Sequence, residues 1–226
     1  MNNRGKTALV LGSSGLVGKE LVETLIKQNT YNKIVLLVRR PIEIINTVCE
    51  PHVVDFDHLE NEEVLFQVTD VFCCLGTTIK KAKTKEAFRK VDFDYPVEAA
   101  KLASKQGVEK FLIVTAMGAN PKSHFFYNQV KGEVEEALNK LELPSLHIFR
   151  PSLLLGNREE FRFGEKIAAK ASYIMNLFMV GPLKTYKAIE AKKVAAAMAE
   201  VASFEATGVH LYPSQEIERI AKRKRF

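Results

Sequence analysis

The 226-residue chain has no tryptophan, only three cysteines and no long uncharged run. No two cysteines stand at a Cys-x-x-Cys spacing, and an odd count does not make a disulfide framework. The longest stretch without a charged residue, 171–183, has 13 residues and contains a Gly-Pro pair, which is too short to span a bilayer. The first predicted strand begins at Thr7, which leaves no room for a signal peptide. These absences predict a protein of the reducing cytoplasm with no membrane span.

Two further classes of site receive little support. The five histidines are scattered, without the spacing of metal ligands, so we expect no metal. The formal net charge is +6, but the charges are spread along the chain, and the one dense basic run is 222–225. We interpret that run as a solvated helix end rather than a nucleic-acid site. The excess of basic over acidic residues also suits a protein that attracts a polyanionic cofactor.

The most informative pattern is a glycine-rich turn near the N-terminus. An apolar strand-like run, 7–11, leads into Gly12, Gly15 and Gly18, and an amphipathic helical pattern continues to residue 27. Glycines permit a tight turn and a close approach of a ligand to the backbone. The N–H groups and dipole of the following helix favour a diphosphate. The pattern therefore predicts a dinucleotide site, and the alternative is a plain turn between strand and helix.

The end of the second predicted strand indicates which dinucleotide. In a dinucleotide-binding fold, the residue about 20 positions after the glycines distinguishes the cofactors, and an acidic residue there favours NAD. This chain has Arg39 and Arg40 instead. Guanidinium groups match a phosphate, so we predict NADP(H), although two solvated arginines would read the same way. Asp55, or the backbone of Phe56, could contact the adenine, and turn chemistry explains Asp55 equally well.

Strand and helix patterns alternate along the chain. This alternation predicts one α/β domain, a doubly wound parallel sheet of the Rossmann type with helices on both faces. The predicted strands are 7–11, 33–38, 52–56, 70–75, 110–115, 145–149 and 208–212. The predicted helices are 15–27, 59–67, 85–106, 125–141, 166–178, 190–202 and 214–225.

The segment 151–190 interrupts the alternation, and we interpret it as a small substrate cap over the carboxyl edge of the sheet. Its aromatic residues, Phe161 and Phe163 among them, suggest an apolar or ring-bearing substrate. They could equally be core residues. The apolar stripe on 166–178 fits a helix docked on its own core better than a helix on a membrane surface.

Tyr127 and Lys131 form the second informative pattern. They are four residues apart on a predicted helix and therefore share one face. An adjacent ammonium group stabilises a phenolate and brings the tyrosine pKa toward the working range. Such a pair can pass a proton to or from a carbonyl or alcohol oxygen while hydride moves to or from a nicotinamide.

Together these motifs resemble the short-chain dehydrogenase/reductase superfamily, and within it the atypical branch of the Tat-interacting, CC3-like proteins. The likeness covers nearly the whole chain and includes 73–78 and 127–133. The resemblance implies catalytic roles for Tyr127 and Lys131. It also implies the following cofactor contacts: Gly12, Ser14, Gly15, Leu16, Val17 and Gly18 at the diphosphate, Arg39 and Arg40 at the 2′-phosphate, Leu75 and Gly76 along the adenosine and ribose, and Leu154 and Arg162 beyond the sixth strand.

The sequence departs from the superfamily at the end of the fifth strand, where most members have a serine that orients the substrate carbonyl. Thr115 could supply that hydroxyl, but Ala116 follows it. The first expectation is therefore an NADP(H)-dependent reductase of a small carbonyl compound, with Tyr127, Lys131 and Thr115 as catalytic residues. The alternative is an NADP(H)-binding regulator that engages a protein partner and has little or no turnover.

Overall fold

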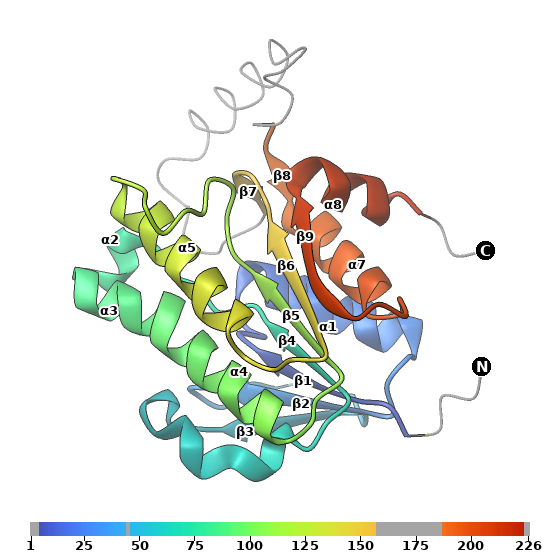
Figure 1. Cartoon of the computed structure of the whole chain (residues 1–226). Coiled ribbons are helices and arrows are strands. Elements are labelled where there is room, and N and C mark those ends of the chain that lie inside the picture. The colour runs from blue at the N-terminus through green and yellow to red at the C-terminus, as the bar shows by residue number, and fades with distance from the viewer. Residues whose placement is uncertain (1–4, 44–45, 157–186, 224–226) are drawn as a thin grey trace.

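Seven parallel strands form the central sheet, in the order β3-β2-β1-β4-β5-β6-β9 (Figure 1). The structure is a computed structural model that describes residues 5–43, 46–156 and 187–223. The strands are β1 (Thr7–Leu11), β2 (Lys33–Val38), β3 (Cys49–Val53), β4 (Asp70–Cys73), β5 (Lys110–Val114), β6 (Ser145–Arg150) and β9 (Gly208–Pro213). The order reverses between β1 and β4, which is where a doubly wound sheet opens a ligand crevice at its carboxyl edge.

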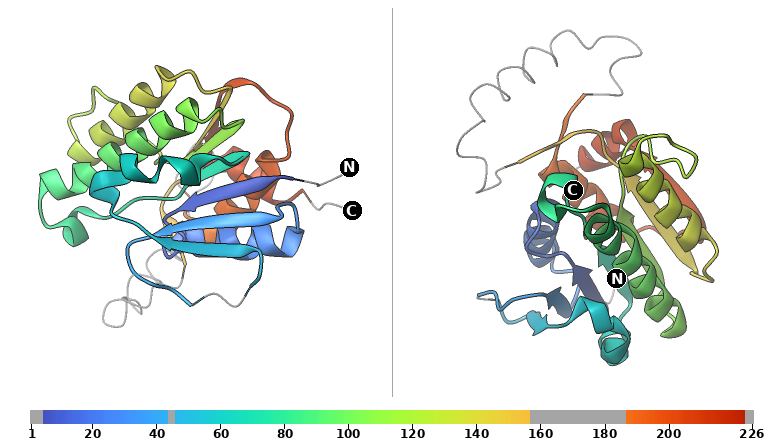
Figure 2. Two further views of the ribbon diagram at one scale, coloured as in Figure 1. Left: turned by 90° about the horizontal axis from the view of Figure 1, so that it is seen from below. Right: turned by 90° about the vertical axis from the view of Figure 1, so that its left-hand side faces the viewer.

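Helices cover both faces of the sheet. They are α1 (Leu16–Gln28), η1 (Phe56–Phe66), α2 (Ile79–Ala82), α3 (Lys85–Arg89), η2 (Lys90–Asp94), α4 (Tyr95–Lys105), α5 (Phe126–Asn139), α7 (Ala191–Val201) and α8 (Ser214–Ala221). One apolar core lies between the sheet and α1, α7 and α8, and a second lies between the sheet and η1, α4 and α5. Figure 2 shows the two helical layers with the sheet between them.

The central strands are apolar on both faces because each face meets a helical layer. In β1, Ala8 and Val10 belong to the first core, and Leu9 and Leu11 belong to the second. Cys73 and Cys74 likewise contact opposite cores, and burial raises the pKa of the Cys73 thiol to about 12. Both cysteines are therefore packing residues.

The predicted α/β architecture is confirmed, and one predicted strand is wrong. The third strand was expected over 52–56, but β3 ends at Val53. The reason is local: the Asp55 carboxylate accepts the Asp57 N–H and caps η1, so Phe56 enters the core from a helix instead of a strand. The last helix is also shorter than the predicted 214–225, because α8 ends at Ala221.

Two short strands, β7 (Leu154–Leu155) and β8 (Ile189–Glu190), form a separate parallel pair beside the main sheet. They are the two ends of the predicted substrate cap. Residues 157–186, which include Arg162 and the predicted helix 166–178, lie outside the described residues.

Candidate functional site

The glycine-rich turn lies directly between β1 and α1. Gly12 has a φ of +80°, and a Cβ at this residue would lie 2.7 Å from the carbonyl oxygen of Cys74. The Gly15 N–H donates to the Gly12 carbonyl at 2.9 Å and closes the turn. A Cβ on Gly18, inside α1, would lie 2.1 Å from that same carbonyl oxygen. Side chains at Gly12 and Gly18 would force the helix away from the turn, so the sequence pattern holds the start of α1 against the end of β1.

The N-terminus of α1 has the chemistry of an anion site. Gly15 is the N-cap, it makes no side-chain capping bond, and the first turn contains no acidic residue. Ser14 and Gly15 are exposed, and the buried Ser13 Oγ has no hydrogen-bond partner among the described residues. The first N–H groups of a helix have no intrahelical acceptor and carry partial positive charge. These residues therefore fit a diphosphate.

The segment after β6 closes one side of this turn. Leu154 is half-buried and packs on the core that includes α1. A Cβ on Gly156 would lie 2.5 Å from a methyl carbon of Leu16. The structure therefore brings Leu154 and Leu16 to the same region, and their contacts with a cofactor stay a prediction.

Arg39 and Arg40 follow β2, next to β1, and both are exposed. Burial and the Asp57 carboxylate raise the pKa of the Tyr95 hydroxyl, whereas the positive charge of Arg39 opposes this shift. Arg39 is therefore near the first turn of η1. Asp55 is exposed, but one of its oxygens caps η1, and Phe56 is buried with its ring 5.4 Å from that of Tyr95. The turn-chemistry interpretation of Asp55 is thus confirmed for that oxygen.

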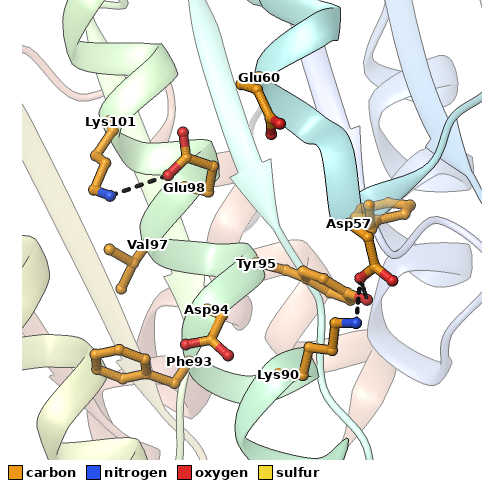
Figure 3. A pocket seen from close by; sticks show the side chains of 10 residues that line it. Asp57, Glu60, Lys90, Phe93, Asp94, Tyr95, Val97, Glu98 and Lys101 are labelled. Atoms are coloured by element: carbon orange, nitrogen blue, oxygen red, sulfur yellow. Dashed lines mark hydrogen bonds and ion pairs between the residues drawn. The ribbon is translucent and has the colours of Figure 1, made fainter.

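A cavity of about 360 Å³ lies between η1 and the helices η2 and α4 (Figure 3). Asp57 is one of its lining residues and lies 2.7 Å from the Lys90 ammonium nitrogen, and it also accepts the Tyr95 hydroxyl at 2.5 Å. Its lining carries both signs of charge and includes neither the glycine turn nor Tyr127. We therefore place the candidate active site elsewhere, at the carboxyl edge of β4 and β5.

Tyr127 and Lys131 lie one turn apart on α5, as predicted. Tyr127 is half-buried, and its ring centroid is 5.7 Å from that of Phe88 on α3. The Lys131 side chain is only 6% exposed, and its Nζ lies 2.7 Å from Oδ1 of Asp92. Burial lowers the pKa of Lys131, but the Asp92 carboxylate and Tyr127 outweigh burial and raise it above its usual value. The lysine is therefore a buried permanent cation.

The lysine also reaches the loop that follows β4. A Cβ on Gly76 would lie 3.8 Å from the Lys131 Nζ and 3.5 Å from Asp92 Oδ1. The other Asp92 oxygen accepts the Thr77 N–H at 2.9 Å. Because Gly12 touches Cys74 in the same loop, the glycine turn and the Tyr127–Lys131 pair meet across 74–77.

Asp92 is a candidate site residue that the sequence analysis missed. It is 1% exposed and lies in η2, a π-helical turn between α3 and α4. Pro96 has no N–H, so the regular helical bond to the Asp92 carbonyl cannot form, which favours a wider turn. Asp94, two residues later, is exposed, and nothing in the sequence distinguishes the two aspartates before the helix is packed.

Thr115 directly follows β5, and its hydroxyl donates to Glu135 Oε1 at 2.6 Å. Glu135 is 4% exposed and also accepts from Arg150 at the end of β6. The single hydroxyl proton of Thr115 is therefore directed into a buried network. Donation to a substrate carbonyl would require this bond to break.

The buried His147 bonds to residues of β6 and β9 and not to the residues of this site. His147 is buried in the sheet, with its ring nitrogens 2.9 Å from the Ser145 hydroxyl and 3.0 Å from the Tyr212 hydroxyl. Burial and the neighbouring His210 lower its pKa to about 4. Among residues 5–43, 46–156 and 187–223, no cluster of His, Cys, Asp and Glu could hold a metal ion.

Comparison with known proteins agrees with this geometry. A family profile described as NAD(P)H-binding matches residues 12–160, from the glycine turn to beyond β7. The chain belongs to this NAD(P)H-binding family. It is 41% identical over 172 residues to Protein HTATIP2 of Rattus norvegicus, a match that covers 74% of this chain and 70% of the relative. The resemblance to the Tat-interacting branch is thereby confirmed.

A yeast relative in the family corrects one expectation. Protein FMP52-1 of Scheffersomyces stipitis, named as mitochondrial, is 36% identical over 157 residues, and the match covers 68% of this chain and 69% of the relative. The predicted cytoplasmic location is wrong by this comparison, because the names of the yeast relatives point to mitochondria. In the described part of the chain, no helix has the length and apolar character needed to span a membrane.

Solved structures show the same fold at low identity. MoeE5, in complex with UDP-glucuronic acid and NAD, superposes with a TM-score of 0.69 at 16% identity, covering 91% of this chain and 75% of that one. UDP-glucose 4-epimerase of Thermotoga maritima gives a TM-score of 0.65 at 16% identity, covering 96% and 81%. The Rossmann-like sheet of this NAD(P)H-binding protein is therefore shared with epimerases of the short-chain dehydrogenase/reductase type.

Proposed function

We propose that the chain is an NADP(H)-dependent oxidoreductase that transfers hydride to a carbonyl carbon, with Tyr127 as the proton donor. The observation that carries the proposal is the convergence at 74–77. There the Gly12 backbone contacts Cys74, and the buried Lys131 ammonium group lies beside Gly76. A dinucleotide-type turn and a Tyr–Lys pair thus border one short loop at the point where the strand order reverses.

The residues around the glycine turn would hold the cofactor. The backbone from Ser14 to Gly18, at the open N-terminus of α1, suits the diphosphate. Arg39 and Arg40 would take the 2′-phosphate, and Lys131 would bind the ribose beside the nicotinamide. The nicotinamide, when bound, supplies the hydride. Leu75 and Gly76 would pack along the adenosine and ribose, and Leu154 would be a further cofactor contact.

Tyr127 would donate its phenolic proton to the carbonyl oxygen as the carbon gains hydride, which leaves a phenolate. The cationic Lys131, which interacts electrostatically with Tyr127, favours that phenolate. The Asp92 carboxylate offsets part of the lysine charge and fixes the position of its Nζ. Asp92 would therefore act as a positioning residue, because it acts on the phenol only through Lys131.

The decisive experiment is NADPH oxidation with a panel of aldehydes, ketones and quinones, repeated with Tyr127→Phe. This change removes only a hydroxyl, and loss of a general acid lowers turnover by a factor of about 10²–10⁴. Tyr212→Phe is the matched control, because it removes a phenolic hydroxyl that bonds to His147, away from the loop 74–77. Near-normal turnover by Tyr127→Phe would refute the proposed mechanism.

A regulatory function is the second candidate, and the Thr115–Glu135 bond is the observation that favours it. With that hydroxyl engaged and an alanine at position 116, the residues directly after β5 offer no ready donor to a substrate. The regulator would bind NADP(H) and present a redox-dependent surface to a protein partner. Tight NADPH binding without turnover of any panel compound would support it over the enzyme.

A further inference from the structure

We propose that the carbonyl substrate carries an acidic group, held by a lysine-rich rim formed by α2, α3 and the loop after β5. This inference rests on the proposed function, because it concerns the substrate of the same Tyr127 site. The rim is defined by Lys80, Lys81, Lys83, Lys85 and Lys122, all of which are exposed.

The charge on the segments that border Tyr127 is one-sided up to Lys85, and the exposed Glu86 is the next residue in α3. Three segments follow β4, β5 and β6 at the carboxyl edge of the sheet, namely 74–85, 115–125 and 151–156. They contain five lysines and not one aspartate or glutamate. The whole chain, by comparison, has 33 basic and 27 acidic residues. The excess of positive charge at this edge is therefore local and does not follow from the composition.

The lysines are close to the candidate active site. In α3, the Lys85 ammonium nitrogen lies 5.3 Å from the ring centroid of Phe126, the residue before Tyr127. Phe88, one turn further along α3, contacts the rings of both Phe126 and Tyr127. Lys80 lies in α2, the short helix that follows the Gly76–Thr77 loop, and Lys83 is the C-cap residue of that helix. Figure 1 shows α2 and α3 beside the start of α5.

Three of the rim lysines form no salt bridge within the described part of the chain, although the Lys85 charge acts on the neighbouring Glu86. Nearby cations outside the rim are paired, because Arg89 contacts Glu133 and Lys90 contacts Asp57. Among the described residues, no carboxylate forms an ion pair with Lys80, Lys83 or Lys85. Lys83 also has a φ of +68°. Glycine would fit that conformation with less strain, so the backbone gives no reason for a lysine at this position.

The rim does not coincide with the predicted sites of the cofactor phosphates. The open N-terminus of α1 follows β1, and Arg39 and Arg40 follow β2, whereas the rim follows β4 and β5 on the opposite side of β1. A negative group attracted to the rim would therefore belong to the substrate. A carboxylate or phosphate a few bonds from the carbonyl would lie near the lysines while the carbonyl faces Tyr127.

The test uses matched acid and ester pairs with the full chain and NADPH. The pairs are 4-carboxybenzaldehyde with methyl 4-formylbenzoate, and succinic semialdehyde with its methyl ester. We expect at least one acid to have the higher kcat/KM. The triple variant Lys80→Gln, Lys83→Gln, Lys85→Gln should raise the KM of that acid about tenfold and change the KM of its ester much less. High salt should also raise the KM of the acid for the wild type, because it screens the lysine charges.

The matched control removes three lysines from the opposite edge of the sheet: Lys27→Gln, Lys140→Gln, Lys222→Gln. These residues lie near the C-termini of α1, α5 and α8, each beside a glutamate one turn earlier. The control has the same net charge as the rim variant, so it measures the effect of overall charge. Equal effects of the two triple variants on the KM of the acid would overturn the proposal, as would a preference for both esters.

A binding measurement separates this proposal from the proposed function. Titration calorimetry with NADP⁺ present compares 4-(hydroxymethyl)benzoate with its methyl ester, and it needs no turnover. If the acid binds more tightly than the ester and this difference disappears in the rim variant, the result supports the proposed role of the rim even if no aldehyde is reduced. Equal affinity for acid and ester would overturn it, and so would binding of a poly-glutamate peptide at the rim with no binding of the small acid.

Discussion

Substitution of Lys131 by methionine should destabilise the fold as well as impair catalysis. The Lys131 Nζ lies 2.7 Å from an Asp92 carboxylate that is 1% exposed. Without the lysine, that carboxylate keeps one backbone donor, the Thr77 N–H. Removing one partner of a buried ion pair costs about 3–5 kcal/mol, because the remaining charge is left uncompensated. We expect Lys131→Met to lower the free energy of unfolding by that amount at pH 7. Urea unfolding of the wild type and of Lys131→Met at pH 7 measures this difference in the free energy of unfolding.

A double-mutant cycle isolates the pair. Asp92→Asn keeps a hydrogen-bond acceptor for Thr77 but removes the charge, so the double variant Asp92→Asn, Lys131→Met should be more stable than Lys131→Met alone. If Lys131→Met unfolds with wild-type stability, or if the cycle gives no coupling between the two residues, the buried ion pair described above is wrong.

Two further predictions concern cofactor choice and acid stability. NADPH should bind about 10- to 100-fold more tightly than NADH, because the loss of a charge-assisted phosphate contact costs about 1.5–3 kcal/mol. Calorimetric titration of the wild type with both cofactors measures this preference, and the double variant Arg39→Ala, Arg40→Ala is the control. Equal affinities of the wild type for NADPH and NADH would refute the prediction. The pKa of His147 is lowered to about 4. As the pH falls, this histidine is therefore protonated in the unfolded state before it is protonated in the folded state. The free energy of unfolding should fall by about 2 kcal/mol between pH 7 and pH 5. His147→Gln should remove this loss of stability at low pH. If the variant keeps the wild-type pH profile, the loss of stability comes from other groups.

Much of the fold was predictable because it depends on local patterns. The first two strands have the predicted bounds, since continuous apolar runs between turn residues leave few alternatives. The third strand was misplaced because Val54 and Phe56 are apolar for another reason: they pack beside the capped start of η1. An apolar residue in the sequence does not reveal from which element it reaches the core.

The candidate site likewise contains residues that the sequence could reveal and residues that it could not. The glycine turn and the Tyr127–Lys131 spacing are local features, and the structure places them as predicted. Asp92 and Glu135 could not be found from the sequence, because each acts on a residue of another element. Asp92 joins η2 to α5, and Glu135 joins α5 to the ends of β5 and β6. Buried charges of this kind acquire partners only when the helices pack.

The β7–β8 pair has a consequence for how such a protein diversifies. The Ile189 N–H donates to the Leu153 carbonyl at 2.9 Å, and the Ser152 hydroxyl donates to the Lys187 carbonyl at 2.5 Å. These bonds hold the first and last residues of the intervening segment side by side, so changes in its length need not propagate into the sheet. If 151–190 is the substrate cap that the sequence predicts, substrate choice can change there while the glycine turn between β1 and α1 stays fixed.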